Sequence, residues 1–385
     1  MTADWMTEAE ALSGELSALR EAFHRMPELG NHEWKTAERI EAYLHACGIP
    51  TERPFGTAVI GRLTGALPGK TAALRADMDA LPLTEATGAP FASETPGVMH
   101  ACGHDIHMTA ALGAAKLLSA RRESLQGSVV FLFQPDEEGD GGAQRMIEAG
   151  CLDGVDAVFG AHVSPALPAG CVGVRYGKFY AASDVFHITV RGKSAHGAER
   201  ERGIDALEAA ARLVPALLAL PETFPGERSV VSVGQLHAGT AVNIVAERAE
   251  LSGVLRTLGQ DSRAAMGERL TETARRVAAQ TGASAEVTLH GSYPGVVNHD
   301  DMTRLAQEAA EALLGADKVS VIPEPTMTTE DFGYFLLERP GTFYHLGAGC
   351  PLPLHNAAFL PEASTAVTGA AMHAAVIERF LSTNP

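Results

Sequence analysis

Two kinds of hydrophobic pattern divide the chain into segments of different structure. Near the N-terminus, apolar residues recur at helical spacing over 7–25 and 35–47, which predicts two amphipathic helices. Further on, runs of consecutive apolar residues occur without alternation, in "TAALRADMDALP" after Gly69, in Val129–Phe133 and in "VDAVFGAHVSP". Strands that are buried on both faces have this composition, so we expect a parallel sheet.

Further elements extend this sheet. "GTFYHLGAG" is a fourth strand candidate, and helices are expected over Met108–Ser119 and Gly142–Glu148. Carboxylates and histidines gather where the apolar runs end. In open α/β sheets the ligand crevice lies at the carboxyl ends of the strands, so we expect the functional residues there.

Residues 183–292 follow a different order of elements. The segment reads as strand, helix, two strands, helix and strand, which is the order of a ferredoxin-like split motif. The sequence therefore predicts an α/β fold in two domains. A catalytic domain with a mostly parallel sheet takes residues 1–182 and 293–385, and a ferredoxin-like α+β domain is inserted over 183–292.

Composition and charge narrow the function classes. The 385 residues carry 30 Lys and Arg against 47 Asp and Glu, a net charge of −17, which argues against nucleic acid or an anionic membrane as a partner. No apolar run is long enough to span a bilayer, and the N-terminus lacks the pattern of a signal peptide. A cytoplasmic protein is expected. The five scattered cysteines do not suggest a disulfide framework.

The stretch "HACGHDIHMT" concentrates side chains that bind metals. On an extended segment Cys102 and His104 face the same side, and a thiolate with an imidazole suits Zn²⁺ and similar divalent metals. His162 and His355 each follow a predicted strand, and Glu138 follows another. These five candidate ligands suffice for two metals if one ligand bridges, and a thiolate can bridge.

The neighbouring Glu137 and Glu138 allow a division of labour, since one carboxylate can bind a metal while the other takes a proton from water. A nucleophilic Cys–His pair is the main alternative. It is less favoured because His104 is too close to Cys102 in sequence, and because it leaves the glutamates and His162 without a role. A Ca²⁺ loop in "DEEGDG" lacks the alternating oxygen ligands of an EF-hand.

Six motifs fall in order along nearly the whole chain: "LRADMDALP", "MHACGHDIHMT", "FLFQPDEEGDGGAQRMIEAG", "GAHV", "GKSAHGA" and "TTEDFGYFL…PLHNAAF". Together they resemble the M20 metallopeptidase family, in its amidohydrolase branch. That branch includes hippurate hydrolases, N-acyl-amino-acid deacylases, auxin-conjugate hydrolases and N-acetyldiaminopimelate deacetylases.

The resemblance implies a site for two divalent metal ions, Zn²⁺ or Mn²⁺, with Co²⁺ or Ni²⁺ also possible. The implied ligands are Cys102, His104, Glu138, His162 and His355, with Cys102 as the bridge. Glu137 is implied as the general base that deprotonates water and then protonates the leaving amine, and Asp79 as a supporting carboxylate. Asp77 stands where the peptidase branch has a metal-binding His. His100, Asp105 and His107 are expected to support the site.

In the family the inserted domain dimerises and covers the site as a lid. By resemblance, His196 in "GKSAH" reaches the site of a neighbouring subunit and stabilises the developing oxyanion. Asn243 and Arg256 match lid residues that contact the substrate, Arg256 being suited to a carboxylate, and His237 is a weaker candidate. Glu330 and Asp331 are expected to support the site.

The expected activity is hydrolysis of the N-acyl amide of an N-acetyl or N-benzoyl amino acid by a homodimer. Rival hypotheses are an N-acetyldiaminopimelate deacetylase of lysine biosynthesis, and a dipeptidase or carboxypeptidase with the same catalytic groups. A homologue that binds metal or ligand without catalysis is the alternative outside the enzymes; against it, both the ligands and the base are intact.

Overall fold

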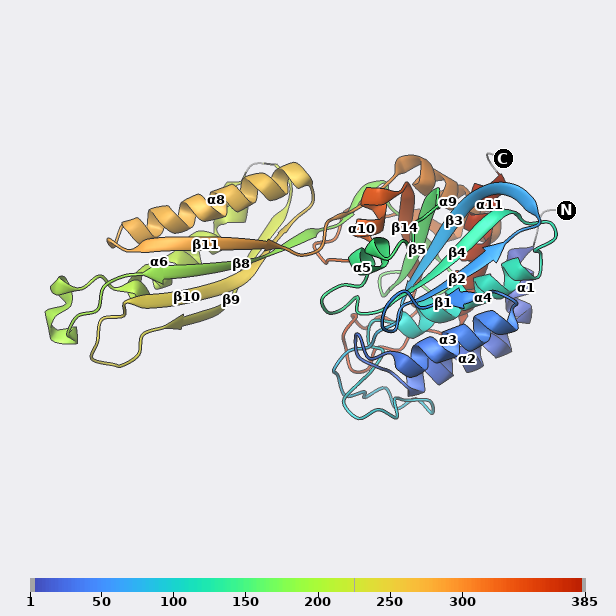
Figure 1. Ribbon diagram of the computed structural model, residues 1–385, viewed down its shortest axis with the longest axis horizontal. Coiled ribbons are helices and arrows are strands. Elements are labelled where there is room, and N and C mark those ends of the chain that lie inside the picture. Colours follow the sequence, from blue (N-terminus) through green and yellow to red (C-terminus); the bar gives the residue numbers. More distant parts are fainter. Residues whose placement is uncertain (1–3, 225, 383–385) are drawn as a thin grey trace. The chain divides into compact units, whose positions relative to one another are not determined.

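The chain folds as two units, drawn in Figure 1. The computed structural model describes residues 4–224 and 226–382. The larger unit extends to Gly177 and includes 297–323 and the chain from Asp331 onward, whereas the inserted unit comprises 178–296 and 324–330. The polypeptide therefore enters the inserted unit twice.

The larger unit alternates helices with strands, as the apolar runs predict. Its elements are α1 (Trp5–Ala11), α2 (Ser13–Arg25), α3 (Trp34–Ala46), β1 (Thr51–Glu52), β2 (Val59–Thr64), β3 (Leu67–Asp77), α4 (His104–Ser119), β4 (Gln126–Gln134), α5 (Ala143–Glu148), β5 (Ala157–Ser164), β6 (Val172–Val174), α9 (Asp300–Leu314), η2 (Ala316–Lys318), β13 (Val319–Val321), α10 (Gly333–Glu338), β14 (Gly341–Gly347) and α11 (Ser364–Ser382). The helix predicted over 7–25 is two helices, α1 and α2, which meet at Leu12.

An eight-stranded sheet runs through this unit in the order β1-β2-β4-β3-β5-β14-β6-β13. The central strands β4, β3, β5 and β14 pair in parallel, and antiparallel pairing is confined to β1–β2, β2–β4 and β14–β6. All eight residues of β5 are buried, because helices cover both of its faces in such a sheet. The prediction of a mostly parallel α/β sheet is confirmed.

Helices α4 and α11 pack against each other at very short range. A Cβ atom on Gly113 of α4 would lie 2.7 Å from the Cβ of Ala370, and one on Gly369 of α11 would lie 2.8 Å from the Cβ of Ala110. Both glycines are therefore needed for this approach. The contact fixes α4, the helix that begins at His104, deep in the hydrophobic core.

The inserted unit is an antiparallel sheet with helices. It contains β8 (Ala182–Arg191), η1 (Gly197–Arg202), α6 (Ala206–Leu218), α7 (Leu220–Thr223), β9 (Ser229–Ala238), β10 (Arg248–Thr257), α8 (Gln260–Ala279) and β11 (Ser284–Gly291). The order β11-β8-β10-β9 is that of the ferredoxin-like motif predicted from the sequence, and α6 and α8 share one hydrophobic core with the strands. A separate two-stranded sheet pairs β7 (Gly177–Tyr180) with β12 (Val296–Asn298).

Among the helices of the described residues, each is either too short or too polar to cross a lipid bilayer.

Candidate metal centre

Five predicted ligands of the larger unit converge at the carboxyl ends of its central strands. The ligand atoms of Cys102, His104 and His162 lie within 4.8 Å of one another, and so do those of Cys102, Glu138 and His355. Cys102 belongs to both groups. The Cys102 Sγ atom is 3.3 Å from His162 Nε2, and Glu138 Oε1 is 3.1 Å from His355 Nε2.

Cys102 and His104 do not lie on an extended segment, so that part of the sequence argument is wrong. Helix α4 begins at His104 rather than at Met108, and Gly103 precedes it with φ +89°. This left-handed turn suits glycine, and a Cβ at residue 103 would meet Val163 Cγ2 at 2.5 Å. The turn, not strand alternation, brings the thiol and the imidazole to the same place.

Hydrogen bonds fix which ring nitrogen of two histidines is available. His104 Nδ1 lies 2.9 Å from the Asp79 carbonyl oxygen, and His162 Nδ1 lies 2.8 Å from that of Val163. A carbonyl only accepts, so Nδ1–H donates in both rings and Nε2 is left for a ligand bond. The Nε2 atom of His104 is buried without a hydrogen-bond partner, as an atom that binds a metal would be.

The electrostatics around Cys102 disfavour a nucleophilic thiolate. Burial raises the pKa of this thiol well above its usual value, and the carboxylates of Glu138 and Glu137 raise it further. A reactive cysteine needs the opposite, a cationic surrounding that lowers the pKa. Divalent cations would supply that charge and favour the thiolate as a ligand. The chemistry of this cluster therefore fits metal binding better than a nucleophilic Cys–His pair.

The two glutamates lie in the loop between β4 and α5. A carboxylate oxygen of Glu137 and one of Glu138 both come within 4.8 Å of a His104 nitrogen. The Glu138 backbone N–H donates to Asp79 Oδ2 at 3.0 Å, and Asp79 Oδ1 lies 3.3 Å from His104 Nδ1. Asp79 thus contacts both a predicted ligand and the loop that carries the predicted base.

His107 lies among the ligands but its nitrogens are occupied. The Val163 N–H donates to His107 Nε2 at 2.9 Å, so this nitrogen carries no proton and Nδ1–H must donate to Asp77 Oδ1 at 2.6 Å. Burial lowers the pKa of His107, in agreement with a neutral ring. Arg75 in turn donates to Asp77 Oδ2 at 2.7 Å. Asp77 is therefore engaged by a histidine and an arginine beneath the cluster.

Sequence reasoning missed two buried polar groups next to this cluster. Arg75, two residues before the end of strand β3, is 1% exposed, and an arginine inside an apolar run could have indicated it. On the other side of α4, Asp105 accepts hydrogen bonds at 2.8 Å from Arg20 Nε and His24 Nδ1. Arg20 and His24 stand four and eight residues after Leu16, on the buried face of α2, so their position in the helical pattern could have indicated them.

In the inserted unit, His196 and Asn243 lie on adjacent segments. The Gly197 N–H donates to the Asn243 carbonyl oxygen at 2.8 Å, and His196 pairs with Ile244 in a β-bridge. The His196 Nδ1 atom accepts a hydrogen bond from the Ala198 N–H at 3.1 Å, so a neutral ring carries its proton on Nε2. Both side chains are exposed.

The other two predicted substrate residues lie on neighbouring strands. His237 is exposed on β9, opposite Glu250 of β10. Arg256 of β10 donates from Nη1 to the Met327 carbonyl oxygen at 2.8 Å and lines a cavity of about 700 Å³ within the inserted unit. The hydroxyl-bearing Ser232, Thr326 and Thr328 line the same cavity.

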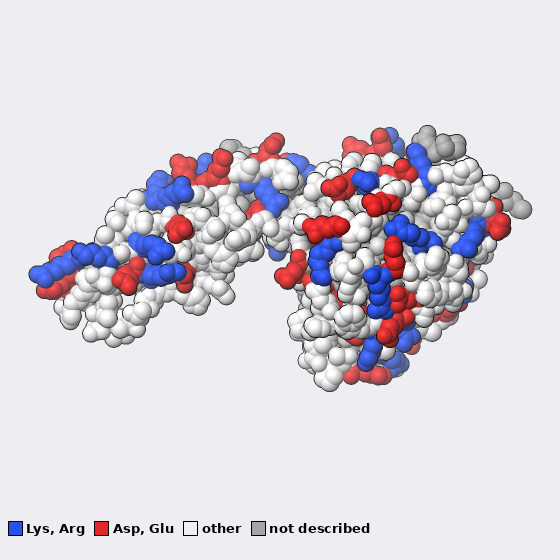
Figure 2. Space-filling model, viewed as in Figure 1, with Lys and Arg blue, Asp and Glu red and all other residues white. Residues whose placement is uncertain are grey.

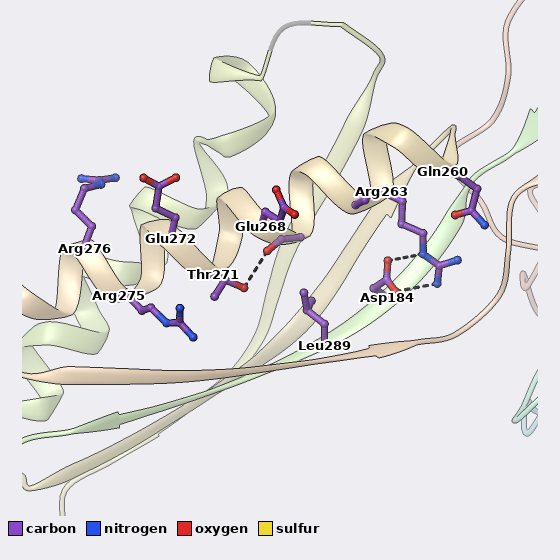
Figure 3. A pocket seen from close by; sticks show the side chains of 11 residues that line it. Asp184, Gln260, Arg263, Glu268, Thr271, Glu272, Arg275, Arg276 and Leu289 are labelled. Carbon is purple, nitrogen blue, oxygen red and sulfur yellow. Dashed lines mark hydrogen bonds and ion pairs between the residues drawn. The ribbon is translucent and has the colours of Figure 1, made fainter.

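A second cavity of the inserted unit, of about 990 Å³, runs along one side of α8 (Figure 3). Arg263 forms a two-pronged ion pair with Asp184 at 2.8 Å, and Leu289 contributes an apolar side chain. The lining mixes arginines with glutamates along the helix. Figure 2 shows the same mixture of signs over the visible face of the described residues, without a continuous stripe of either sign.

Known proteins match this chain over most of its length. The profile of the peptidase family M20/M25/M40 matches residues 73–379. Thermostable carboxypeptidase 1 of Saccharolobus solfataricus is 36% identical over 94% of this chain and 94% of its own. N-acetyldiaminopimelate deacetylase of Streptococcus suis is 38% identical over 90% of this chain and 94% of its own. N-acetyl-L-cysteine deacetylase of Bacillus subtilis is 35% identical over 97% and 90%.

Among solved structures, the Bacillus subtilis YXEP protein superposes with a TM-score of 0.88 at 34% identity, over 97% of this chain and 99% of that one. It is described as a dinuclear metal-binding peptidase from the M20 family.

Proposed function

The chain belongs to the M20/M25/M40 family of peptidases, a family of hydrolases, and on this premise we propose that it is a metal-dependent N-acyl-amino-acid amidohydrolase. It would cleave the amide of an N-acetyl or N-benzoyl amino acid into a carboxylate and a free amino acid. The observation that carries the proposal is the convergence of one thiol, three imidazoles and two carboxylates at the strand ends.

The residues present fit a pair of divalent metal ions. Cys102, His104, Glu138, His162 and His355 would hold them, and the Cys102 thiolate, which belongs to two of the ligand groups, would be available to both ions. The mixed S, N and O donors suit Zn²⁺ or Mn²⁺, with Co²⁺ or Ni²⁺ as alternatives. When bound, such ions polarise the scissile carbonyl and make water more acidic.

The residues of the chain then handle the protons. We propose that Glu137 takes a proton from the attacking water and returns it to the leaving amine nitrogen. The Asp79 carbonyl oxygen orients the His104 ring, and the Asp79 carboxylate accepts from the Glu138 backbone N–H. Glu138 is thereby placed to bind metal, and Glu137 is left to act as the base. Replacing Glu137→Gln should reduce turnover by about 10²- to 10⁴-fold while metal content stays unchanged. Near-normal turnover would remove Glu137 from the role of base.

We propose a homodimer in which the inserted unit of one copy completes the site of the other. His196, with a neutral ring that carries its proton on Nε2, would donate to the oxyanion. Arg256 and Asn243 would bind the substrate carboxylate and amide, and His237 would lie near them. Two exposed apolar side chains, Val242 and Ile244, flank Asn243 and are suited to cover by a second copy.

Mixing two inactive variants tests the shared site. A Glu137→Gln chain and a His196→Ala chain, inactive alone, should regain about a quarter of the original activity when refolded together, since about half of all dimers are then mixed and each mixed dimer holds one intact site out of two. No recovery, with dimers verified by light scattering, would place His196 in the site of its own chain or outside the chemistry.

N-acetyldiaminopimelate deacetylase is the second candidate, favoured by the 38% identity to the Streptococcus suis enzyme. A dipeptidase or carboxypeptidase is the third, given the Saccharolobus relative. A panel of N-acetyl, N-benzoyl and long-chain N-acyl amino acids, N-acetyldiaminopimelate and dipeptides, assayed with Zn²⁺, Mn²⁺ or Co²⁺, separates these activities. Absence of turnover across the panel would favour a protein that binds metal or ligand without catalysis.

A further inference from the structure

The loop that carries Glu137 and Glu138 has unusual backbone geometry. It connects Gln134, the last residue of β4, to Ala143, the first of α5. Asp136 has φ +60°, and the Gly141 N–H donates to the Asp136 carbonyl oxygen at 3.0 Å. Aspartate adopts the left-handed region more readily than most residues, but still at a cost in free energy that surrounding contacts offset. Some contact must therefore fix this loop.

Asp331 supplies such a contact at both ends of the loop. Its Oδ2 atom accepts hydrogen bonds from Gln134 Nε2 at 2.7 Å and from the backbone N–H groups of Gly142 and Ala143 at 3.1 Å each. Its Oδ1 atom accepts from Arg75 Nη2 at 2.8 Å. The side chain is fully buried, and a carboxylate oxygen of Asp331 lies within 4.8 Å of one of Glu137.

Glu33 holds the same loop at Asp136, the residue before Glu137. Its Oε1 atom accepts from the Asp136 N–H at 3.0 Å, and its Oε2 atom accepts from the Thr57 hydroxyl at 2.6 Å. Glu33 is 0% exposed. With Asp79 on the Glu138 N–H, three buried carboxylates therefore bind the backbone of a loop that is itself acidic.

We propose that Asp331 and Glu33 are positioning residues that set the place of Glu137, and we call them, with Asp79, the carboxylate clamp. The clamp works because backbone N–H groups can only donate, and the side-chain carboxyl oxygens that face them accept. The catalytic importance of the clamp rests on the proposed function, because it takes Glu137 as the base. The effect of the clamp on the loop does not depend on that role.

The two new members of the clamp respond differently to the conservative amide substitution. All four groups around Asp331 are donors, so the NH₂ group of Asp331→Asn must face a donor whichever way it turns. Gln134 cannot compensate by turning its amide, because its Oε1 atom accepts from Arg75 Nε at 2.9 Å. Glu33→Gln keeps an acceptor for Asp136, and the Thr57 hydroxyl can turn to accept from the new NH₂ group.

Hydrogen exchange on the metal-free full chain measures the clamp directly. In Asp331→Asn, the amides of Gly142 and Ala143 should exchange about tenfold faster or more, whereas Glu33→Gln should leave residues 134–143 unchanged. In Glu33→Ala, the Asp136 amide should exchange faster, because it loses its acceptor. The control is Asn298→Ala, which removes three hydrogen bonds away from the loop, a partly buried one to Arg175 and two buried ones to Phe343. Unchanged exchange in both Asp331→Asn and Glu33→Ala would overturn the clamp.

Kinetics at saturating metal then test the consequence for Glu137. Asp331→Asn should lower kcat by about 10- to 100-fold with KM within about threefold, and Asn298→Ala and Glu33→Gln should keep kcat within about threefold. A kcat for Asp331→Asn close to that of the unmodified protein would refute its positioning role. If the unmodified protein hydrolyses nothing on the panel, the proposed function fails, and exchange still decides whether the clamp exists.

Discussion

Replacing Arg75 by methionine removes a cation that is paired with two buried carboxylates, Asp77 and Asp331. The guanidinium of Arg75 donates to Asp77 Oδ2 at 2.7 Å, to Asp331 Oδ1 at 2.8 Å and to Gln134 Oε1 at 2.9 Å. The charged side chains are 0% exposed, so water cannot take the place of the lost donors. Methionine fills a similar volume, which confines the loss to electrostatics and hydrogen bonding.

The expected destabilisation follows from this geometry. Breaking a buried ion pair by removing one partner costs about 3–5 kcal/mol. Two carboxylates lose their partner here, but each keeps other donors, so we expect about 4 kcal/mol for Arg75→Met. With a urea dependence of roughly 2–3 kcal/mol per M, the midpoint of unfolding should fall by about 1–2 M.

Tryptophan fluorescence isolates the relevant unit, because both tryptophans of the chain, Trp5 and Trp34, lie in the larger unit. The control is Arg62→Met, which removes a surface pair with Glu52 at 3.1 Å and should cost less than about 1 kcal/mol. If the midpoint for Arg75→Met lies within about 0.3 M of the unmodified protein, the reasoning from buried charge is refuted.

Three further predictions concern the cluster and its loop. Cys102→Ser should lower the metal content from two ions to one or fewer by elemental analysis, and two retained ions would exclude an essential bridge. Gly103→Ala should weaken metal affinity by about tenfold or more in titration calorimetry, because its φ of +89° and the Val163 side chain oppose a Cβ; unchanged affinity would contradict this. Burial raises the pKa of Glu33 to about 7, so this carboxyl favours folding most at low pH and loses that contribution as the pH rises to about 7. In the metal-free protein, the stability of Glu33→Gln relative to the unmodified chain should therefore rise between pH 5 and about 7 in urea titrations, and a constant difference would refute the shift.

The fold could be predicted from the sequence because burial on both faces leaves a visible pattern. The unalternating runs in β3, β4 and β5 gave the parallel sheet, and the order of elements gave the ferredoxin-like unit. The candidate site residues could also be recognised, because residue types that bind metals or transfer protons stand where the predicted strands end. The assignment of ligands and base to them remains a prediction.

Contacts between distant segments could not be predicted in the same way. The extended geometry assumed around Cys102 was wrong because Gly103 is left-handed, and Val163, which leaves no room for a Cβ there, is 60 positions further on. Likewise, nothing local shows that Asp331 meets Gln134 or that Glu33 meets Asp136. Such hydrogen bonds depend on register between elements, which periodicity does not encode.

The close approach of α4 and α11 has a consequence for the order in which the protein matures. Helix α11 comes last along the described chain, yet Gly369 must pack on Ala110 before the core around α4 is closed. During synthesis, nearly all of the inserted unit leaves the ribosome before α11 does. We expect the inserted unit to fold first on the nascent chain, while the segment bearing Cys102 and His104 stays open to solvent and to metal until the last helix arrives.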